Sequence, residues 1–312
     1  MSAPTSPFTK GIASILFAAL VWGTTGTAAT FAPAVGPIAI GAAAMTGGGL
    51  LQAAVALPGL IPAWNHLRQH LPLLVLGGFA VAVYPLAFYA SMRLAGVAIG
   101  TVVSIGSAPL FAALLEMIFD GSRLTSRWMI GAALGVAGIA LMAPLGHEPA
   151  ASPPLATNSL GIGLGLGAGL TYALYSWVAR RLMLHHIPTR TVMGALFGSG
   201  GLMLLPVLMA TGAPFFQSWT NLAAGFYMAV VPMFLGYLAF GYGLARVEAS
   251  IATTITLFEP VIATLLAVIV VGERLSLASW LGIGLVTLCL VWITTPAHRL
   301  TRVIRKNISL RH

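Results

Sequence analysis

Residues 249–271 read "ASIATTITLFEPVIATLLAVIVV", and this stretch decides which kind of fold the chain can adopt. It is long enough to cross a bilayer, because a transmembrane helix needs about 20 mostly apolar residues. Its one charged residue, Glu259, is followed directly by Pro260. A carboxylate in hydrocarbon costs at least about 2.5 kcal/mol, and a proline removes a backbone hydrogen bond. A span that keeps both is typical of a helix that faces a cavity and can bend locally.

The composition of the whole chain indicates a membrane protein. Of its 312 residues, 58% are hydrophobic and only 7% are charged, which is too little charge for the surface of a soluble domain. A β-barrel would alternate in segments of about ten residues, and no such pattern is present. We therefore expect an all-α integral membrane protein with ten transmembrane helices. The predicted spans are 11–31, 35–57, 71–92, 97–119, 127–143, 158–180, 189–210, 221–245, 249–271 and 277–295.

The basic residues predict the orientation. Loops that carry Lys and Arg near span ends stay in the cytoplasm. With both termini in the cytoplasm, only Arg93 and Arg274 of the fifteen Lys and Arg fall outside. Residues 297–312 then form a basic cytoplasmic tail, which we expect to touch anionic lipid and not nucleic acid.

The two halves of the chain form a weak internal repeat. A proline-rich segment without basic residues, 146–157, separates five spans in 1–145 from five spans in 158–296, and we expect it to be an extracytoplasmic linker. A shift of 151 residues aligns Pro109 with Pro260, and it also aligns Gly121, Arg123, Leu124 and Gly131 with identical residues. Because each half has an odd number of spans, the second half is inverted relative to the first. Inverted five-helix repeats with a site near mid-membrane are typical of secondary transporters.

A family resemblance lies in residues 241–292. A Glu-Pro pair in the middle of one span, a "GERL" turn and a glycine-rich last span resemble the second repeat of the EamA family in the drug/metabolite transporter superfamily. Residues 96–142 resemble the first repeat more weakly, with Ala108 in place of the glutamate. The resemblance implies a carrier that exports small organic metabolites across the bacterial inner membrane by alternating access. Within the family the chain is most similar to exporters of aromatic amino acids, which implies aromatic and other neutral amino acids as cargo.

Polar and aromatic residues inside the spans are the candidates for a substrate site. Thr253, Thr256 and Glu259 recur at every third position, and Ser104 belongs to a similar stripe in the fourth span. Trp22 lies in the middle of the first span beside Thr24, away from the interfaces where tryptophan normally gathers. The candidate substrate-binding residues are Trp22, Thr24, Tyr84, Ser104, Tyr172, Tyr237, Thr253, Thr256 and Glu259, and the candidate hinges are Pro109 and Pro260. Each also has a plain structural interpretation: helix packing for the hydroxyls and rings, and backbone capping for Glu259.

Other function classes find less support in the sequence. No phosphate-binding loop of the G-x-x-x-x-G-K-[ST] type is present, and all seven histidines fall in loops or tails, so we expect no catalytic centre, no cofactor and no metal. A passive facilitator of metabolites and a drug or cation efflux carrier are the alternatives, and the sequence supports an intramembrane enzyme or a packing scaffold much less. The expected partners are a small-molecule substrate and membrane lipid, and the oligomeric state stays open. Glu116, near a cytoplasmic span end, is expected to pair with Arg123 or Arg127 at the surface.

Overall fold

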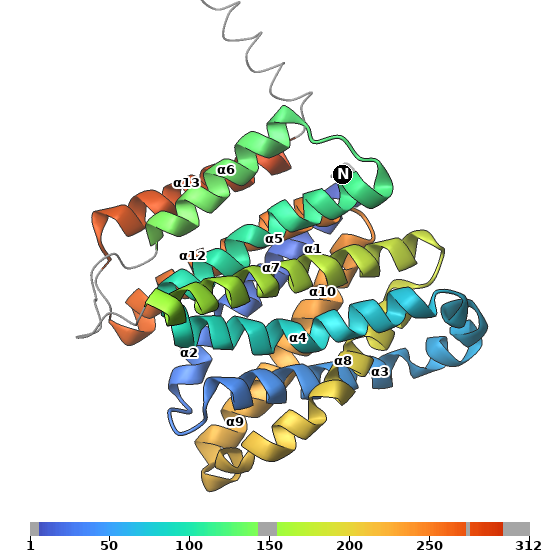
Figure 1. Cartoon of the computed structure of the whole chain (residues 1–312), viewed down its shortest axis with the longest axis horizontal. Coiled ribbons are helices and arrows are strands. Elements are labelled where there is room, and N and C mark those ends of the chain that lie inside the picture. The colour runs from blue at the N-terminus through green and yellow to red at the C-terminus, as the bar shows by residue number, and fades with distance from the viewer. Residues whose placement is uncertain (1–5, 143–154, 273–274, 296–312) are drawn as a thin grey trace, which may run out of the picture.

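Every regular element is helical in the computed structural model, which describes residues 6–142, 155–272 and 275–295 (Figure 1). The first half holds α1 (Pro7–Gly23), α2 (Thr25–Thr30), α3 (Pro37–Gln69), α4 (Leu71–Ala95), α5 (Val97–Asp120) and α6 (Ser126–Met142). The second half holds α7 (Leu155–Leu184), α8 (Thr189–Thr211), η1 (Ala213–Gln217), α9 (Trp219–Met228), η2 (Ala229–Gly236), α10 (Tyr237–Leu244), α11 (Ala249–Ile255), η3 (Thr256–Phe258), α12 (Glu259–Leu266), η4 (Ala267–Val271) and α13 (Leu277–Thr294).

The predicted spans are confirmed as helices. Among the described residues, nine helical segments are long and apolar enough to cross a membrane, and α6 is a shorter apolar helix of 17 residues. Several spans are composite: α1 and α2 together form the first, and α11, η3, α12 and η4 form the ninth. Most of the predicted linker, Arg274 and the basic tail lie outside the described residues.

The repeat is visible in how equivalent helices end. Gly121 terminates α5 with φ of 66°, and Gly272 terminates η4 with φ of 81°. Both are left-handed conformations that glycine adopts without the steric cost of a side chain. The two glycines are 151 residues apart, so the same turn closes the fourth span of one half and the fourth span of the inverted half.

Equivalent helices of the two halves also pack on each other. In sequence order within the halves, α3 corresponds to α8 and α6 corresponds to α13, and each of these pairs is in extensive contact. Glycine permits the close approach: a Cβ on Gly49 would lie 2.1 Å from the carbonyl oxygen of Phe197, and one on Gly282 would lie 2.5 Å from that of Gly138. The bundle is therefore two intertwined five-helix units rather than two separate lobes.

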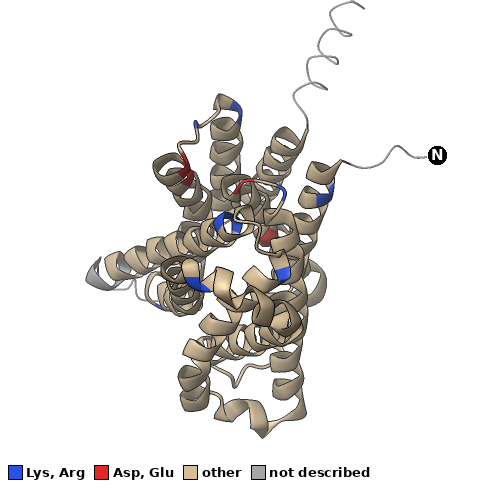
Figure 2. Ribbon diagram, turned by 90° about the vertical axis from the view of Figure 1, so that its right-hand side faces the viewer, with Lys and Arg blue, Asp and Glu red and all other residues tan. Residues whose placement is uncertain are grey.

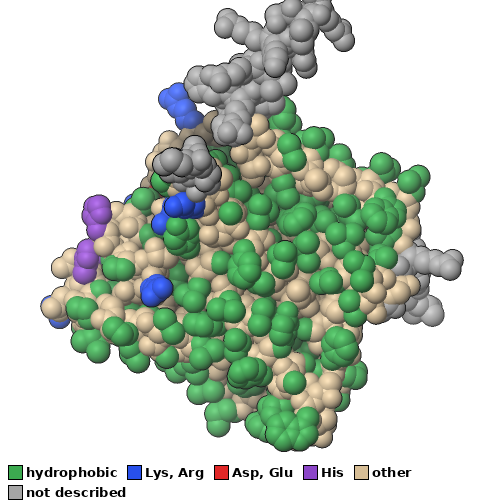
Figure 3. All heavy atoms as spheres, turned by 180° about the vertical axis from the view of Figure 1, so that it is seen from behind, with side chains coloured by type: hydrophobic (Ala, Val, Ile, Leu, Met, Phe, Trp, Pro, Cys, Tyr) green, Lys and Arg blue, Asp and Glu red, His purple; other side chains and the backbone are tan. Residues whose placement is uncertain are grey.

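Charged residues gather at one end of the bundle. Figure 2 looks onto this end, which we call the basic end; it carries the start of α1 with Lys10, the end of α3 with Arg68 and the end of α7 with Arg180. Arg93 lies at the opposite end, in the last turn of α4. The outer surface between the ends is mostly apolar (Figure 3), as expected for a lipid-facing girdle.

The expectation for Glu116 is wrong. Its side chain is only 4% exposed and accepts backbone N–H groups of Ala249 at 2.6 Å and Ser250 at 3.3 Å, at the first turn of α11. The carboxylate therefore caps a helix of the other repeat and interacts favourably with the positive end of its dipole. The sequence spacing suggested a surface arginine because it could not show where α11 begins in space.

Candidate substrate-binding site

A cavity between the two repeats leads from the Arg93 end to Glu259. It has a volume of about 470 Å³ and continues into a smaller pocket of about 60 Å³. The two share Trp22, Thr25, Phe88, Tyr89 and Glu259 in their linings. The larger space is within the range of about 300–1,000 Å³ that small-molecule sites occupy.

The backbone around Glu259 follows from the proline beside it. In a continuous α-helix the N–H of residue 260 would bond the carbonyl of Thr256, but Pro260 has no N–H. The N–H of Glu259 bonds that carbonyl instead, which tightens residues 256–258 into a single 3₁₀ turn, η3. The local change that the sequence predicted beside Pro260 is therefore a tightened turn, and this turn places Glu259 at the start of α12.

The equivalent proline does not interrupt its helix. Pro109 is buried inside a continuous α5, so this candidate hinge has no counterpart of the η3 turn. A single proline can be absorbed by a helix that loses one hydrogen bond and bends. The asymmetry is also chemical, because Ala108, fully buried, stands where the second repeat has Glu259.

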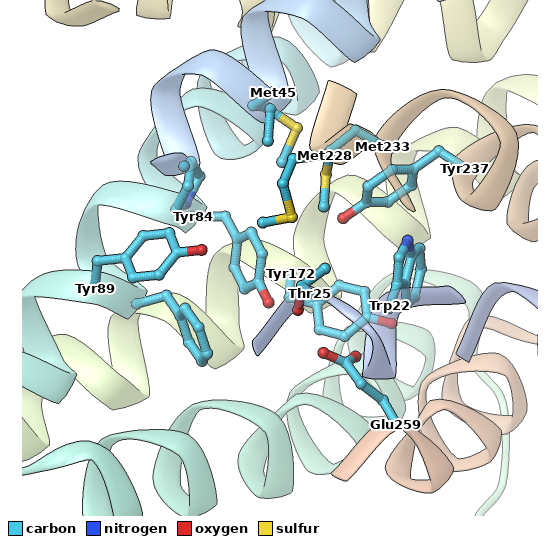
Figure 4. Close-up of a pocket in the computed structure, with 14 residues that line it drawn as sticks. Trp22, Thr25, Met45, Tyr84, Tyr89, Tyr172, Met228, Met233, Tyr237 and Glu259 are labelled. Carbon is cyan, nitrogen blue, oxygen red and sulfur yellow. The ribbon is translucent and has the colours of Figure 1, made fainter. Parts of the chain in front are cut away.

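The carboxylate of Glu259 faces the cavity without a partner. Its side chain is half-buried and points between Tyr84, Thr25 and Tyr172 (Figure 4). Among the described residues it has no hydrogen bond and no ion pair. Since an unpaired charge is costly in an apolar environment, the two carboxylate oxygens of Glu259 are available to a proton, water or a cationic group of a ligand.

Aromatic rings form the wall opposite the carboxylate. The ring centroid of Trp22 lies 4.6 Å from that of Tyr237 and 6.4 Å from that of Tyr172, the second pair edge to face. Tyr84 lies 5.5 Å from Tyr172. Such tilted and edge-on contacts are favourable for aromatic quadrupoles, and together they give the cavity a continuous apolar surface.

Hydrogen bonds hold these rings in place. The indole Nε1 of Trp22 donates to the carbonyl oxygen of Pro232 at 2.8 Å, in the π-helical turn η2. Gly236 makes room for the indole, because a Cβ there would lie 2.7 Å from Nε1. The hydroxyl of Tyr172 pairs with Oγ1 of Thr256 at 2.8 Å. The rings of Trp22 and Tyr172 are thus held from behind by hydrogen bonds of their polar atoms.

The structure brings together five of the nine predicted substrate residues. Trp22, Tyr84, Tyr172, Tyr237 and Glu259 line the smaller pocket (Figure 4), and Pro260 lines the larger cavity.

Four predicted substrate residues lie elsewhere. Thr24 bonds the Tyr227 hydroxyl at 2.7 Å in a separate lateral groove. Thr253 donates to carbonyls of its own helix, and Thr256 lies behind Tyr172. Ser104 is fully buried in α5, where its carbonyl lies close to Gly169 of α7.

Sequence reasoning missed several lining residues. Phe88, Tyr89 and Arg93 of α4 and Thr25 of α2 also line the cavity. Three methionines, Met45, Met228 and Met233, cover the smaller pocket. The four-residue spacings from Tyr84 to Phe88 and from Tyr89 to Arg93 were a readable signal, because residues four apart are neighbours on a helix surface.

Polar contacts join the two repeats at the basic end of the bundle. Glu116 of α5 caps α11, as described above, and Asp120 of the same helix accepts the indole N–H of Trp177 in α7 at 2.7 Å. Asp120 also pairs with Arg181. The cavity is thus lined by exposed Arg93 at one end of the bundle, and contacts between the repeats lie at the other end.

Comparison with known proteins agrees with this architecture. The model of the EamA-like transporter family matches residues 9–143 and 159–295, that is, each half once. A Bacillus subtilis protein named "Uncharacterized transporter YwfM" is 33% identical over 291 residues, covering 91% of this chain and 94% of its own. "Protein PecM" of Dickeya dadantii is 30% identical, with 86% of each chain covered.

More distant similarity extends to a named exporter and a solved structure. A "Probable terminal-alkyne amino-acid exporter" of Streptantibioticus cattleyicolor is 26% identical over 54% of each chain. One solved crystal structure superposes with a TM-score of 0.76 at 22% identity, covering 93% of this chain and 98% of its own, which shows the shared fold. With both halves matched by its model, the chain belongs to the EamA-like transporter family.

Proposed function

We propose that the protein is a secondary carrier that exports aromatic and other neutral amino acids across the bacterial inner membrane by alternating access. The observation that carries the proposal is the unpaired Glu259 carboxylate in an aromatic cavity between the inverted repeats. Glu259 is ten residues beyond Ala249, so it lies about 15 Å along the helix from the basic end, near the middle of a membrane of about 30 Å. The proposed orientation places the basic end, where α1 begins, in the cytoplasm.

The chemistry of the cavity supports an amphipathic organic cargo. Aromatic faces and methionine sulfurs suit an apolar or aromatic side chain, and a carboxylate suits an ammonium group. The exporter name of the Streptantibioticus cattleyicolor relative adds support for amino acids.

The basic end supplies the gate that the mechanism needs. For the cavity to open there, α5 must release Ala249 and Ser250 of α11 from Glu116, and Asp120 must release Arg181. Binding of a substrate can offset the loss of these two small groups of contacts, so α5 can move relative to α7 and α11 and open the basic end.

Transport by the purified protein in proteoliposomes tests the proposal. Vesicles loaded with one unlabelled neutral amino acid should accumulate the labelled form by counterflow, and Glu259→Gln should lose this activity, whereas Glu248→Gln, at an exposed glutamate outside the cavity, should keep it. Repeating the assay under a pH gradient separates the mechanisms. Wild-type uptake that a pH gradient drives to concentrations above equilibrium indicates proton antiport.

Other outcomes would replace the proposal. Amino-acid movement that is indifferent to both pH and the Glu259 variant would make the protein a passive facilitator with a structural glutamate. Transport confined to organic cations would make it a cation efflux carrier.

A further inference from the structure

We propose that the site recognises both charged groups of a zwitterionic amino acid: Glu259 binds the ammonium group and Arg93 binds the carboxylate. This inference rests on the proposed function and names the residues that would set its specificity. Both side chains line the 470 Å³ cavity, from opposite repeats.

Glu259 is suited to the ammonium group. It is the single acidic residue among the described residues that line either part of the cavity, and it lies where the two parts meet. Its carboxylate has no hydrogen bond or ion pair there. Trp22 and Tyr172 line the same pocket, and aromatic rings attract cations, which adds to the suitability of this pocket for an ammonium group.

Arg93 is suited to the carboxylate. It is the single basic residue among the described lining residues, it is exposed, and it makes no hydrogen bond or ion pair with any of them. A guanidinium group presents a planar fork of donors that matches a carboxylate in two hydrogen bonds.

The geometry of α4 aims Arg93 toward the cavity. Arg93 follows Tyr89 by four residues, so the two share one face and lie about 6 Å apart along the axis. Side chains on a helix tilt toward its N-terminus. Toward its N-terminus α4 passes Tyr89, which lines both parts of the cavity, so this tilt favours a guanidinium position between the solvent and Glu259.

Together the two charges favour a zwitterionic amino acid over the corresponding amine or the corresponding carboxylic acid. A primary amine would satisfy Glu259 and leave Arg93 solvated, whereas a carboxylic acid would meet the unpaired Glu259. A zwitterion satisfies both, and its side chain can contact Trp22, Tyr84 or Met233. Arg93 is then a specificity-determining residue that separates amino acids from organic cations.

Matched ligands test this directly. Binding to the purified protein in detergent can be measured calorimetrically for L-phenylalanine, phenethylamine and 3-phenylpropionate, and for L-leucine with its amine and acid analogues. The variants are Arg93→Gln, Arg93→Lys and Glu259→Gln. Arg123→Gln, at an exposed arginine of the basic end, is the control with the same change in net charge.

We expect the wild type to bind a zwitterion at least about tenfold more tightly than its amine, since a charge-assisted bond contributes that much. Arg93→Gln should weaken zwitterion binding about tenfold and leave amine binding unchanged, and Arg93→Lys should recover part of the difference. Glu259→Gln should weaken both the zwitterion and the amine. Arg123→Gln should change none of these constants.

Equal weakening of amine and zwitterion by Arg93→Gln would overturn the proposal, as would a wild type that prefers the amine or binds no amino acid. Failure of the proposed function looks different. Zwitterions would then bind with the expected dependence on Arg93 and Glu259, but none would be transported in proteoliposomes.

Discussion

Replacing Glu116 tests the contact that closes the basic end. Its carboxylate, 4% exposed, accepts two backbone N–H groups of α11. A hydrogen bond to a charged group contributes about 1.5–3 kcal/mol, and a charge at a helix N-terminus adds about 0.3–1 kcal/mol. Since such contributions overlap, we expect Glu116→Ala to lower the free energy of unfolding by about 3 kcal/mol, and Glu116→Gln, which keeps an acceptor oxygen, by about 1 kcal/mol.

Thermal unfolding of the purified protein in detergent measures this effect. A loss of about 3 kcal/mol should lower the Tm by roughly 5 °C in a chain of this length. Glu248 provides a matched control, because it is exposed and its side chain makes no capping bond at the same helix end. The reasoning is refuted if Glu116→Ala leaves the Tm within about 1 °C of wild type, or if Glu248→Ala lowers it equally.

Three further predictions concern the wall, the turn and the basic end. Trp22→Ala should raise the KM for aromatic amino acids more than for aliphatic ones in transport assays, and equal increases would argue against stacking on the indole. Pro260→Ala should slow turnover more than it weakens binding, because it restores an N–H at residue 260 that can bond the carbonyl of Thr256. Unchanged kinetics would remove the hinge role. Burial, then the neighbouring His185 and His66, lower the pKa of His70 below its ordinary value of 6.5. The native state therefore favours neutral His70 and should lose stability as the pH falls below 6.5. Between pH 7 and pH 5.5 the Tm of the wild type should fall further than the Tm of His70→Gln. Parallel dependence of the two Tm values on pH would contradict this.

The architecture and part of the site were predictable from the sequence. Twenty-residue apolar stretches and the 151-residue shift gave the ten spans and the inverted repeat, because both depend on composition and spacing along the chain. Trp22, Tyr172 and Glu259 could be found because tryptophan, tyrosine and carboxylates are unusual in the middle of a span.

The direction in which individual side chains point was less predictable. Adjacent helical residues point about 100° apart, so the choice of Thr24 over Thr25 required the rotation of the first span around its break, which sequence periodicity does not set. Arg93 resembled an ordinary interfacial charge until α4 was placed against the cavity. Glu116 was misassigned because its partners are backbone N–H groups 133 residues away, which leave no mark in side-chain patterns.

Access to the cavity from both sides of the membrane is the most direct test of the account. Thr25 lines both parts of the cavity, and Cys289, the single native cysteine, is buried. A Thr25→Cys, Cys289→Ala protein in sealed vesicles can be treated with a membrane-impermeant maleimide from either side. We predict rapid labelling from the Arg93 side and slower labelling from the basic side, with a transported amino acid added at moderate concentration accelerating the second. Labelling from the Arg93 side alone, unchanged by any amino acid, would contradict alternating access.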